Sequence, residues 1–126
     1  MLSMLQMLKL VLPFPVSVNS MYSNHGRRRI KSKRYRLWRA KALEAITEQY
    51  TGLPLDCDIC LQIALSVPCK RRRDLDNHAK GLQDVLTGTI IVDDCLIREL
   101  QMSWLPQSKG GYAELTITKY KIGDRK

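Results

Sequence analysis

The chain has 126 residues, which is enough for one domain with a modest hydrophobic core and too few for two. Apolar residues make up 44% and charged residues 26%, a composition that excludes wholesale disorder. Lys and Arg total 21 against 12 Asp and Glu, so the formal net charge of +9 favours a polyanionic partner, with nucleic acid first among the candidates.

The first half of the chain begins with a predicted strand over residues 7 to 12, closed by two prolines that cannot donate to a ladder. A polar loop is expected from residue 16 to about residue 31, and loops of that length are usually functional. Ser32 is expected to cap a helix that ends at Gly52 and Pro54. The apolar residues that recur at helical spacing in it are Tyr35, Trp38, Ala42, Ala45 and Ile46.

In the second half, the alternation over residues 59 to 67 predicts a half-buried strand. Helical spacing over residues 75 to 86 predicts a second helix, and the apolar run 90 to 92 is expected to be a short strand. Two further strands are predicted at about 96 to 104 and 112 to 119. This order predicts a single α+β domain with a mixed sheet and two main helices packed on it.

The N-terminus is apolar but does not resemble a signal peptide, because Lys9 interrupts the apolar stretch and no small-residue cleavage site follows. The sequence also lacks an apolar run of about 18 residues that would span a membrane. We therefore expect a soluble, cytoplasmic protein without a membrane partner.

The positive charge is concentrated in two segments. Nine of the fifteen residues from 27 to 41 are basic, and residues 70 to 73 add four in a row. The alternative is a merely solubilising surface, but like charges this dense repel one another unless a polyanion binds them. The residues predicted to bind DNA are Arg27, Arg28, Arg29, Lys31, Lys33, Arg34, Arg71, Arg72 and Arg73.

The four cysteines, Cys57, Cys60, Cys69 and Cys95, raise the question of a disulfide or a zinc site. Cys57 and Cys60 have C-x-x-C spacing, but they lie in or beside a strand pattern, where a separation of three places side chains on opposite faces. A zinc site needs four convergent ligands, and the sequence has no second C-x-x-C pair. We therefore expect reduced thiols.

Acidic residues occur where a predicted strand gives way to a predicted helix. Asp74 and Asp76 point to the same side if the backbone there is extended, and Lys80 follows Asp76 by one helical turn. Carboxylates suit Mg²⁺ or Mn²⁺, and an ammonium stabilises phosphoryl oxygens as they gain charge. The pattern predicts a phosphodiesterase site, to which Asp93 or Asp94 adds a third carboxylate.

Each acidic segment also has a purely structural interpretation. Asp74 or Asp76 can cap a helix, with Lys80 as an ordinary salt-bridge partner. Asp93 and Asp94 can form an ordinary turn. The occurrence of three acidic positions in a basic chain favours the metal site, because uncompensated acids repel DNA unless a cation lies between them.

With these residues the chain resembles the RusA family of Holliday junction resolvases, which phages and prophages often carry. The resemblance extends over about residues 7 to 119 and is most specific in R-R-D-L-D-N-x-x-K, from Arg72 to Lys80. Further similar segments are Asp84, the Leu86-Thr87-Gly88 turn, the pair Asp93-Asp94, Lys109-Gly110-Gly111 with residues 114 to 117, and the proline-rich residues 12 to 15 with Asn19.

The resemblance implies a homodimer that resolves four-way DNA junctions by paired symmetric nicks, in recombination and repair. It places metal-binding aspartates at Asp74, Asp76 and Asp94 and a functional lysine at Lys80, and it implies Mg²⁺ or Mn²⁺ and no other cofactor. Residues 1–126 then form a single domain. Within it, residues 1–6 are predicted to be an extension or a misassigned start, and residues 120–126 a flexible tail.

Two hypotheses from other classes compete with this one. A non-catalytic basic protein that coats or bends nucleic acid predicts binding without any metal-dependent product. A zinc-binding regulator built on the cysteines predicts stoichiometric zinc in the purified protein.

Overall fold

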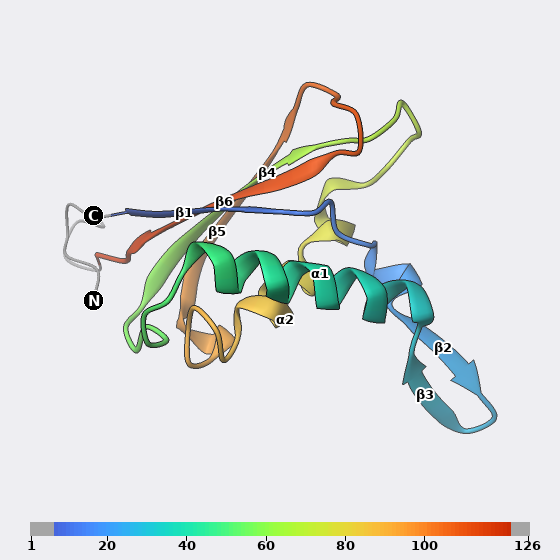
Figure 1. The fold of residues 1–126 in the computed structure, drawn as a ribbon, viewed down its shortest axis with the longest axis horizontal. Helices are drawn as coiled ribbons and strands as arrows, with labels where there is room; N and C mark the ends of the chain where they lie inside the picture. Colours follow the sequence, from blue (N-terminus) through green and yellow to red (C-terminus); the bar gives the residue numbers. More distant parts are fainter. Residues whose placement is uncertain (1–6, 122–126) are drawn as a thin grey trace.

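A four-stranded sheet carries two helices on one of its faces, and a separate two-stranded hairpin projects from one end (Figure 1). The computed structural model describes residues 7–121. The strands are β1 (Met7–Leu12), β2 (Tyr22–His25), β3 (Arg28–Lys31), β4 (Ile59–Ser66), β5 (Ile97–Leu105) and β6 (Tyr112–Lys119). The helices are α1 (Lys33–Gln49) and α2 (Lys80–Leu86), with short 3₁₀ helices η1 (Val18–Ser20), η2 (Leu75–His78) and η3 (Asp94–Leu96).

The main sheet is mixed, with the strand order β1-β6-β4-β5. β4 and β5 run parallel, whereas the β1–β6 and β4–β6 pairs are antiparallel. Parallel neighbours need a long crossover connection, and here it contains η2, α2 and η3. The predicted α+β class, with a mixed sheet and two main helices in a single domain, is confirmed.

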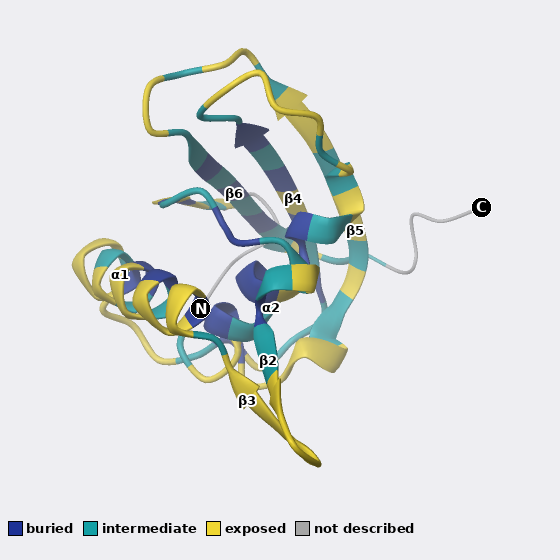
Figure 2. Ribbon diagram, turned by 90° about the vertical axis from the view of Figure 1, so that its right-hand side faces the viewer, coloured by how far each residue is buried: buried dark blue, intermediate teal, exposed yellow. Residues whose placement is uncertain are grey.

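The core lies between the sheet and the two helices, as the facing buried segments of Figure 2 show. Strict alternation in β4 directs Ile59, Leu61, Ile63 and Leu65 inward and leaves Gln62 exposed, as the sequence pattern predicts. Burying each such side chain fully stabilises the fold by roughly 1.5–3 kcal/mol. Neither α1 nor α2, the two α-helices of the described part, is long and apolar enough to cross a membrane.

The helices touch each other where α2 has a glycine. A Cβ on Gly81 would lie 3.3 Å from Cζ3 of Trp38 and 3.5 Å from Cε1 of Tyr35. The rings of Tyr35 and Trp38 are stacked, with centroids 6.0 Å apart. The absence of a side chain at Gly81 therefore lets α2 approach the two rings, which explains a residue that otherwise weakens a helix.

Side-chain hydrogen bonds secure both ends of α1. The Ser32 hydroxyl donates to Ser20 O at 2.6 Å and accepts from Tyr35 N at 3.1 Å, so the predicted N-cap is confirmed. At the other end the Gln49 amide bonds the N–H and the C=O of Val11 at 2.8 and 2.7 Å. Gln49 thus occupies backbone groups of β1, which is an edge strand of the sheet.

Three predictions of local structure are wrong in part. The expected loop over residues 16 to 31 forms the β2–β3 hairpin in its second half, with Gly26 at φ 65° in the turn. The expected helix over residues 75 to 86 is divided into the 3₁₀ helix η2 and the α-helix α2, which begins at Lys80. Residues 90 to 92 form isolated β-bridges in place of a strand: Ile91 pairs with Leu55 and Thr87, and Leu86 O accepts three backbone N–H groups from residues 89 to 91.

Predictions about the chain ends fall largely outside the described residues. The expected N-terminal extension, residues 1–6, lies there entirely. Of the expected tail, residues 120–126, the structure describes only Tyr120 and Lys121. Tyr120 N donates to Asp58 O at 3.0 Å, so the tail remains a prediction for the residues beyond these two.

Replacing the capping hydroxyl tests how much the hairpin-to-helix junction contributes to stability. We expect Ser32→Ala to lower the free energy of unfolding by about 1 kcal/mol, because Tyr35 N loses its acceptor. Urea denaturation measures the change. Thr47→Ala is the control, since the Thr47 hydroxyl lies on the exposed surface of the same helix, and it should change stability by less than about 0.5 kcal/mol. Equal stability of the two variants would contradict the capping role.

Candidate active site

Asp74 stands at the start of η2 with an extended backbone, φ −92° and ψ 129°. Its side chain makes no capping hydrogen bond there, and Asp76 lies within the first turn of η2. Asp74 thus occupies the N-cap position that the structural interpretation gives it, but its carboxylate makes no capping bond. Both carboxylates are exposed to solvent, where a cation can reach them.

A buried histidine holds the backbone of this segment in place. His78 Nδ1 donates to Asp74 O at 3.0 Å, and the imidazole is only 4% exposed. Burial lowers the pKa of His78 and so favours the neutral ring. It packs between Phe14 and Trp104, at centroid distances of 5.2 and 6.0 Å. The sequence analysis missed this role, although His78 falls on the apolar face that Leu75 and Leu82 mark out.

Asp74 lines a hollow of about 340 Å³ together with residues that the sequence assigned to DNA binding. Arg71, Arg72 and Arg73 form part of its wall, and Asn19 and Asn77 add amide groups. The structure thus brings one predicted metal ligand together with three predicted DNA-binding arginines. Asp76 is not among the residues that line this hollow.

Arg73 has a different environment from its neighbours. Its guanidinium donates to the carbonyls of Cys69 and Arg71, both at 3.1 Å, and to Cys69 Sγ at 3.3 Å. It also lies 5.3 Å from the centre of the Phe14 ring. These contacts hold the basic loop, residues 69 to 73, folded around Arg73, whereas Arg71 and Arg72 are exposed.

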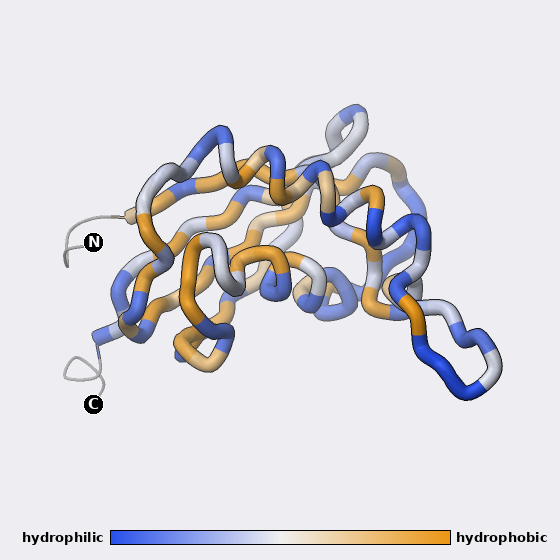
Figure 3. The backbone as a smooth tube through the Cα atoms, turned by 60° about the horizontal axis from the view of Figure 1, so that its bottom comes forward, coloured by the Kyte–Doolittle hydropathy of each residue, from blue (hydrophilic) through white to orange (hydrophobic). Residues whose placement is uncertain are grey.

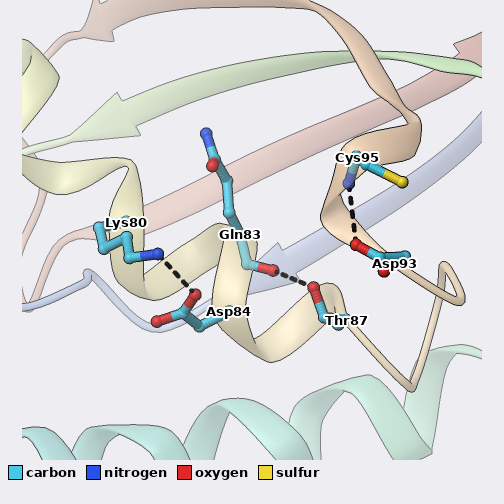
Figure 4. Close-up of polar contacts among 6 residues, drawn as sticks. All are labelled: Lys80, Gln83, Asp84, Thr87, Asp93 and Cys95. Carbon is cyan, nitrogen blue, oxygen red and sulfur yellow. Dashed lines mark hydrogen bonds and ion pairs between the residues drawn. The ribbon is translucent and has the colours of Figure 1, made fainter.

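Lys80 begins α2 and pairs with Asp84 at 3.3 Å (Figure 4). Asp76 and Lys80 do not share the single helix that the sequence predicted, because Asp76 belongs to the separate helix η2. An ion pair this exposed contributes less than about 1 kcal/mol. The ammonium can therefore leave Asp84 for a phosphate at low cost.

Asp93 and Asp94 occupy different positions in η3. Asp93 caps this helix, because its Oδ1 accepts from Cys95 N at 3.0 Å, and this bond lowers the pKa of Asp93 (Figure 4). The turn interpretation is thus correct for Asp93. Asp94, which is exposed, makes no such capping contact as the first residue of η3. Of the two, only Asp93 therefore has a capping role in η3.

The two acidic segments lie at opposite ends of the β4–β5 crossover. The backbone carbonyl of Asp74 accepts a hydrogen bond from His78. The His78 ring in turn packs against Trp104, near the end of β5. Asp94 precedes Ile97, the first residue of β5, which pairs with the first residue of β4. In residues 7–121, no group of three or more His, Cys, Asp or Glu side chains is placed to hold a metal ion.

The β2–β3 hairpin carries Arg28, Arg29 and Lys31, with Arg27 in its turn, and it projects from the body as a strongly hydrophilic arm (Figure 3). The Arg29 guanidinium lies 4.4 Å above the ring of Tyr22. Lys33 and Arg34 follow in the first turn of α1, which has no acidic residue. Cations there are opposed by the helix dipole, and an anionic ligand would offset this repulsion.

No disulfide joins any of the four cysteines, all of which lie in the described residues 7–121. Cys57 packs against the core, whereas Cys60 takes an outward position between the inward-facing Ile59 and Leu61 of β4. The prediction that these two thiols lie on opposite sides is confirmed. Cys69 and Cys95 are exposed.

Comparisons with known proteins agree with the sequence resemblance. The family described as Endodeoxyribonuclease RusA matches residues 13–118. A crossover junction endodeoxyribonuclease of Escherichia coli K12 is 32% identical over 111 residues, covering 87% of this chain and 92% of that protein. The enzymes of that name from Shigella sonnei and Enterobacteria phage 82 are each 33% identical over 112 residues, with the same coverage of both chains.

The thiol of Cys69 reports on the position of Arg73. Because the hydrogen bond from Arg73 lowers the pKa of Cys69, more thiolate is present at a given pH. We expect Arg73→Gln to move the midpoint of the pH–rate curve for alkylation of Cys69 by iodoacetamide upward. Mass spectrometry of the Cys69 peptide measures the rate. Arg98→Gln is the control, because Arg98 lies at the start of β5, whereas Cys69 follows the end of β4 that pairs with the last residue of β5. An unchanged midpoint in Arg73→Gln would show that Arg73 does not contact the thiol in solution.

Proposed function

We propose, because this chain belongs to the RusA family of endodeoxyribonucleases, that it hydrolyses phosphodiester bonds of four-way DNA junctions with a divalent metal ion. One observation carries the proposal. The exposed carboxylate of Asp74 lies in a hollow whose wall includes three arginines, at a strand-to-helix junction, and it makes no capping hydrogen bond. Acids in such a basic surface repel DNA unless a cation joins them to the phosphates.

Asp74 and Asp76 are the residues that would hold Mg²⁺ or Mn²⁺. Exposed oxygen ligands suit these ions, and Mg²⁺ needs only one or two carboxylates when water and phosphate oxygens complete its shell. When bound, the metal supplies a water of lowered pKa and offsets charge on the leaving oxygen. His78 keeps Asp74 in place through the backbone of η2.

Cationic side chains around this pair would bind the scissile phosphate. Arg71 and Arg72 are exposed, and Arg71 lines the same hollow as Asp74. We assign to Lys80 the stabilisation of charge on the phosphoryl oxygens, for which it would exchange Asp84 for the phosphate. Arg73 instead keeps the loop folded.

A third carboxylate from Asp94 requires a second copy of the chain. The crossover runs from the last residue of β4 to the first residue of β5. These two points are roughly 26 Å apart along the sheet, because β4 has 8 residues. A two-fold dimer can place the Asp94 end of one protomer beside the Asp74 end of its partner and so form two equivalent sites. Two sites also suit paired nicks in opposing strands of a junction. We therefore propose a homodimer whose active sites each use both chains.

The β2–β3 hairpin and the first turn of α1 would bind the junction arms. Their cations, Arg27, Arg28, Arg29, Lys31, Lys33 and Arg34, are all exposed. Contacts of this kind go to phosphates and carry no sequence information, so they fit a substrate recognised by its shape.

Loss of one carboxylate tests the metal site. We expect Asp76→Asn to reduce Mg²⁺-dependent nicking of a labelled four-way junction by roughly a hundredfold or more. Junction binding should be unchanged or tighter, because one negative charge is removed from a DNA-binding surface. Asp56→Asn, in the exposed segment before β4, is the control and should cut normally. Undiminished cleavage by Asp76→Asn would refute the site, and wild-type binding without any metal-dependent product would refute the enzyme.

Salt dependence tests the hairpin. We expect Arg28→Gln combined with Arg29→Gln to weaken junction binding and to lower the slope of log K against log salt by about 2, one unit for each lost phosphate contact. Lys119→Gln, an exposed cation at the far end of β6, should leave the slope unchanged. An equal slope for the double variant and the wild type would exclude hairpin–phosphate contacts.

A further inference from the structure

A second hollow of about 340 Å³ lies between α1 and the proline-rich segment after β1, and we call it the Phe14 groove. Its apolar wall is formed by Pro13, Phe14, Leu37 and Trp38. Four cations, Arg34, Lys41, Arg71 and Arg73, also line it, and none of the described lining residues is acidic. The groove thus combines aromatic surface with uncompensated positive charge.

The apolar wall is held rigidly. Trp38 Nε1 donates to Pro13 O at 3.0 Å, which ties the proline-rich segment to α1. Trp38 itself is stacked on Tyr35 in the core. Leu37 is 57% exposed beside this wall. A flat apolar ligand in the groove would cover it.

The Phe14 groove adjoins the hollow that contains Asp74. Ser17, Arg71, Arg73 and His78 line both. Phe14 lies at this boundary, 5.2 Å from the His78 ring that fixes the Asp74 backbone. A nucleotide chain with one phosphate at Asp74 would therefore have a neighbouring base at the mouth of the Phe14 groove.

Nucleobases are recognised by stacking on aromatic rings and guanidinium planes, while flanking cations bind the backbone. The Phe14 ring, the anchored guanidinium of Arg73 and the outer cations Arg34 and Lys41 provide these elements together. We propose that the Phe14 groove receives one nucleobase that has left the helical stack at the branch point, next to the phosphate to be cut. This inference rests on the proposed junction-cutting function.

The groove would then contribute to the choice of substrate. At a branch point a base can be stacked on one side only, so little stacking is lost when it enters the groove. In an unbroken duplex the same base is stacked on both faces, so moving it into the groove costs more stacking free energy than at a branch point. Selection for branched DNA would thus come from the base groove, in addition to the phosphate contacts of the hairpin.

Photocrosslinking tests the position of the base directly. A four-way junction carrying 5-iododeoxyuridine at the branch point is irradiated with the wild-type protein in EDTA, and the crosslinked peptide is identified by mass spectrometry. We expect attachment at Phe14 or Trp38, and no attachment there from a linear duplex that carries the same label. Attachment confined to the hairpin or to the start of α1, or no attachment at all, would overturn the inference.

Two variants test whether the groove matters for cutting. Phe14→Leu keeps an apolar side chain but removes the stacking face, and we expect junction nicking to fall about tenfold. Lys41→Gln, at an exposed position on α1, should lower the crosslink yield without affecting the fold, and Lys119→Gln should change neither readout. If Phe14→Leu melts at a lower temperature than the wild type, Lys41→Gln decides the test.

The two proposals fail in different ways. Wild-type protein that nicks the junction with Mg²⁺ but never crosslinks through the groove would refute the base site and leave the junction-cutting function standing. Crosslinking at Phe14 or Trp38 without any nicking would refute the enzyme and support the groove as a binding site for unstacked bases. Unreduced nicking by both Phe14→Leu and Lys41→Gln would overturn a role of the groove in cutting.

Discussion

The parallel pairing of β4 with β5 determines where the functional groups of this protein lie. Parallel strands cannot be joined by a tight turn, so the chain has to travel back along the sheet before β5 begins. All the predicted metal ligands and Lys80 lie on that crossover. Its two ends are also the two ends of the sheet, so Asp74 and Asp94 lie apart in one chain, and the two-chain site that we propose would unite them.

Elements that depend on short-range signals could be predicted from the sequence. The alternation in β4 and the Ser32 cap of α1 are local patterns, and the structure reproduces both. The β2–β3 hairpin was missed because its strands are polar and carry no alternating apolar residues, although Gly26 between two four-residue segments is a turn signal. The division of residues 75 to 86 into η2 and α2 interrupts an apolar pattern that continues through both helices, so the pattern alone does not reveal it.

The same distinction applies to the candidate site. Asp74, Asp76 and the arginines before them are neighbours in sequence, and their proximity was predictable. The position of Asp94 depends on the direction of β5 relative to β4, which the sequence pattern does not specify. Likewise the Phe14 groove joins residues from the segment after β1, from α1 and from the basic loop, and only the tertiary fold brings aromatic and cationic groups of such different origin together.

A site that uses both chains can be tested by complementation. Asp76→Asn and Asp94→Asn chains with different affinity tags are co-expressed, and the mixed dimer is purified through both tags. If the site combines Asp76 of one chain with Asp94 of the other, one of its two sites is intact, and the mixed dimer should nick one strand of a four-way junction while both parent homodimers remain inactive. A mixed dimer as inactive as its parents would contradict the account.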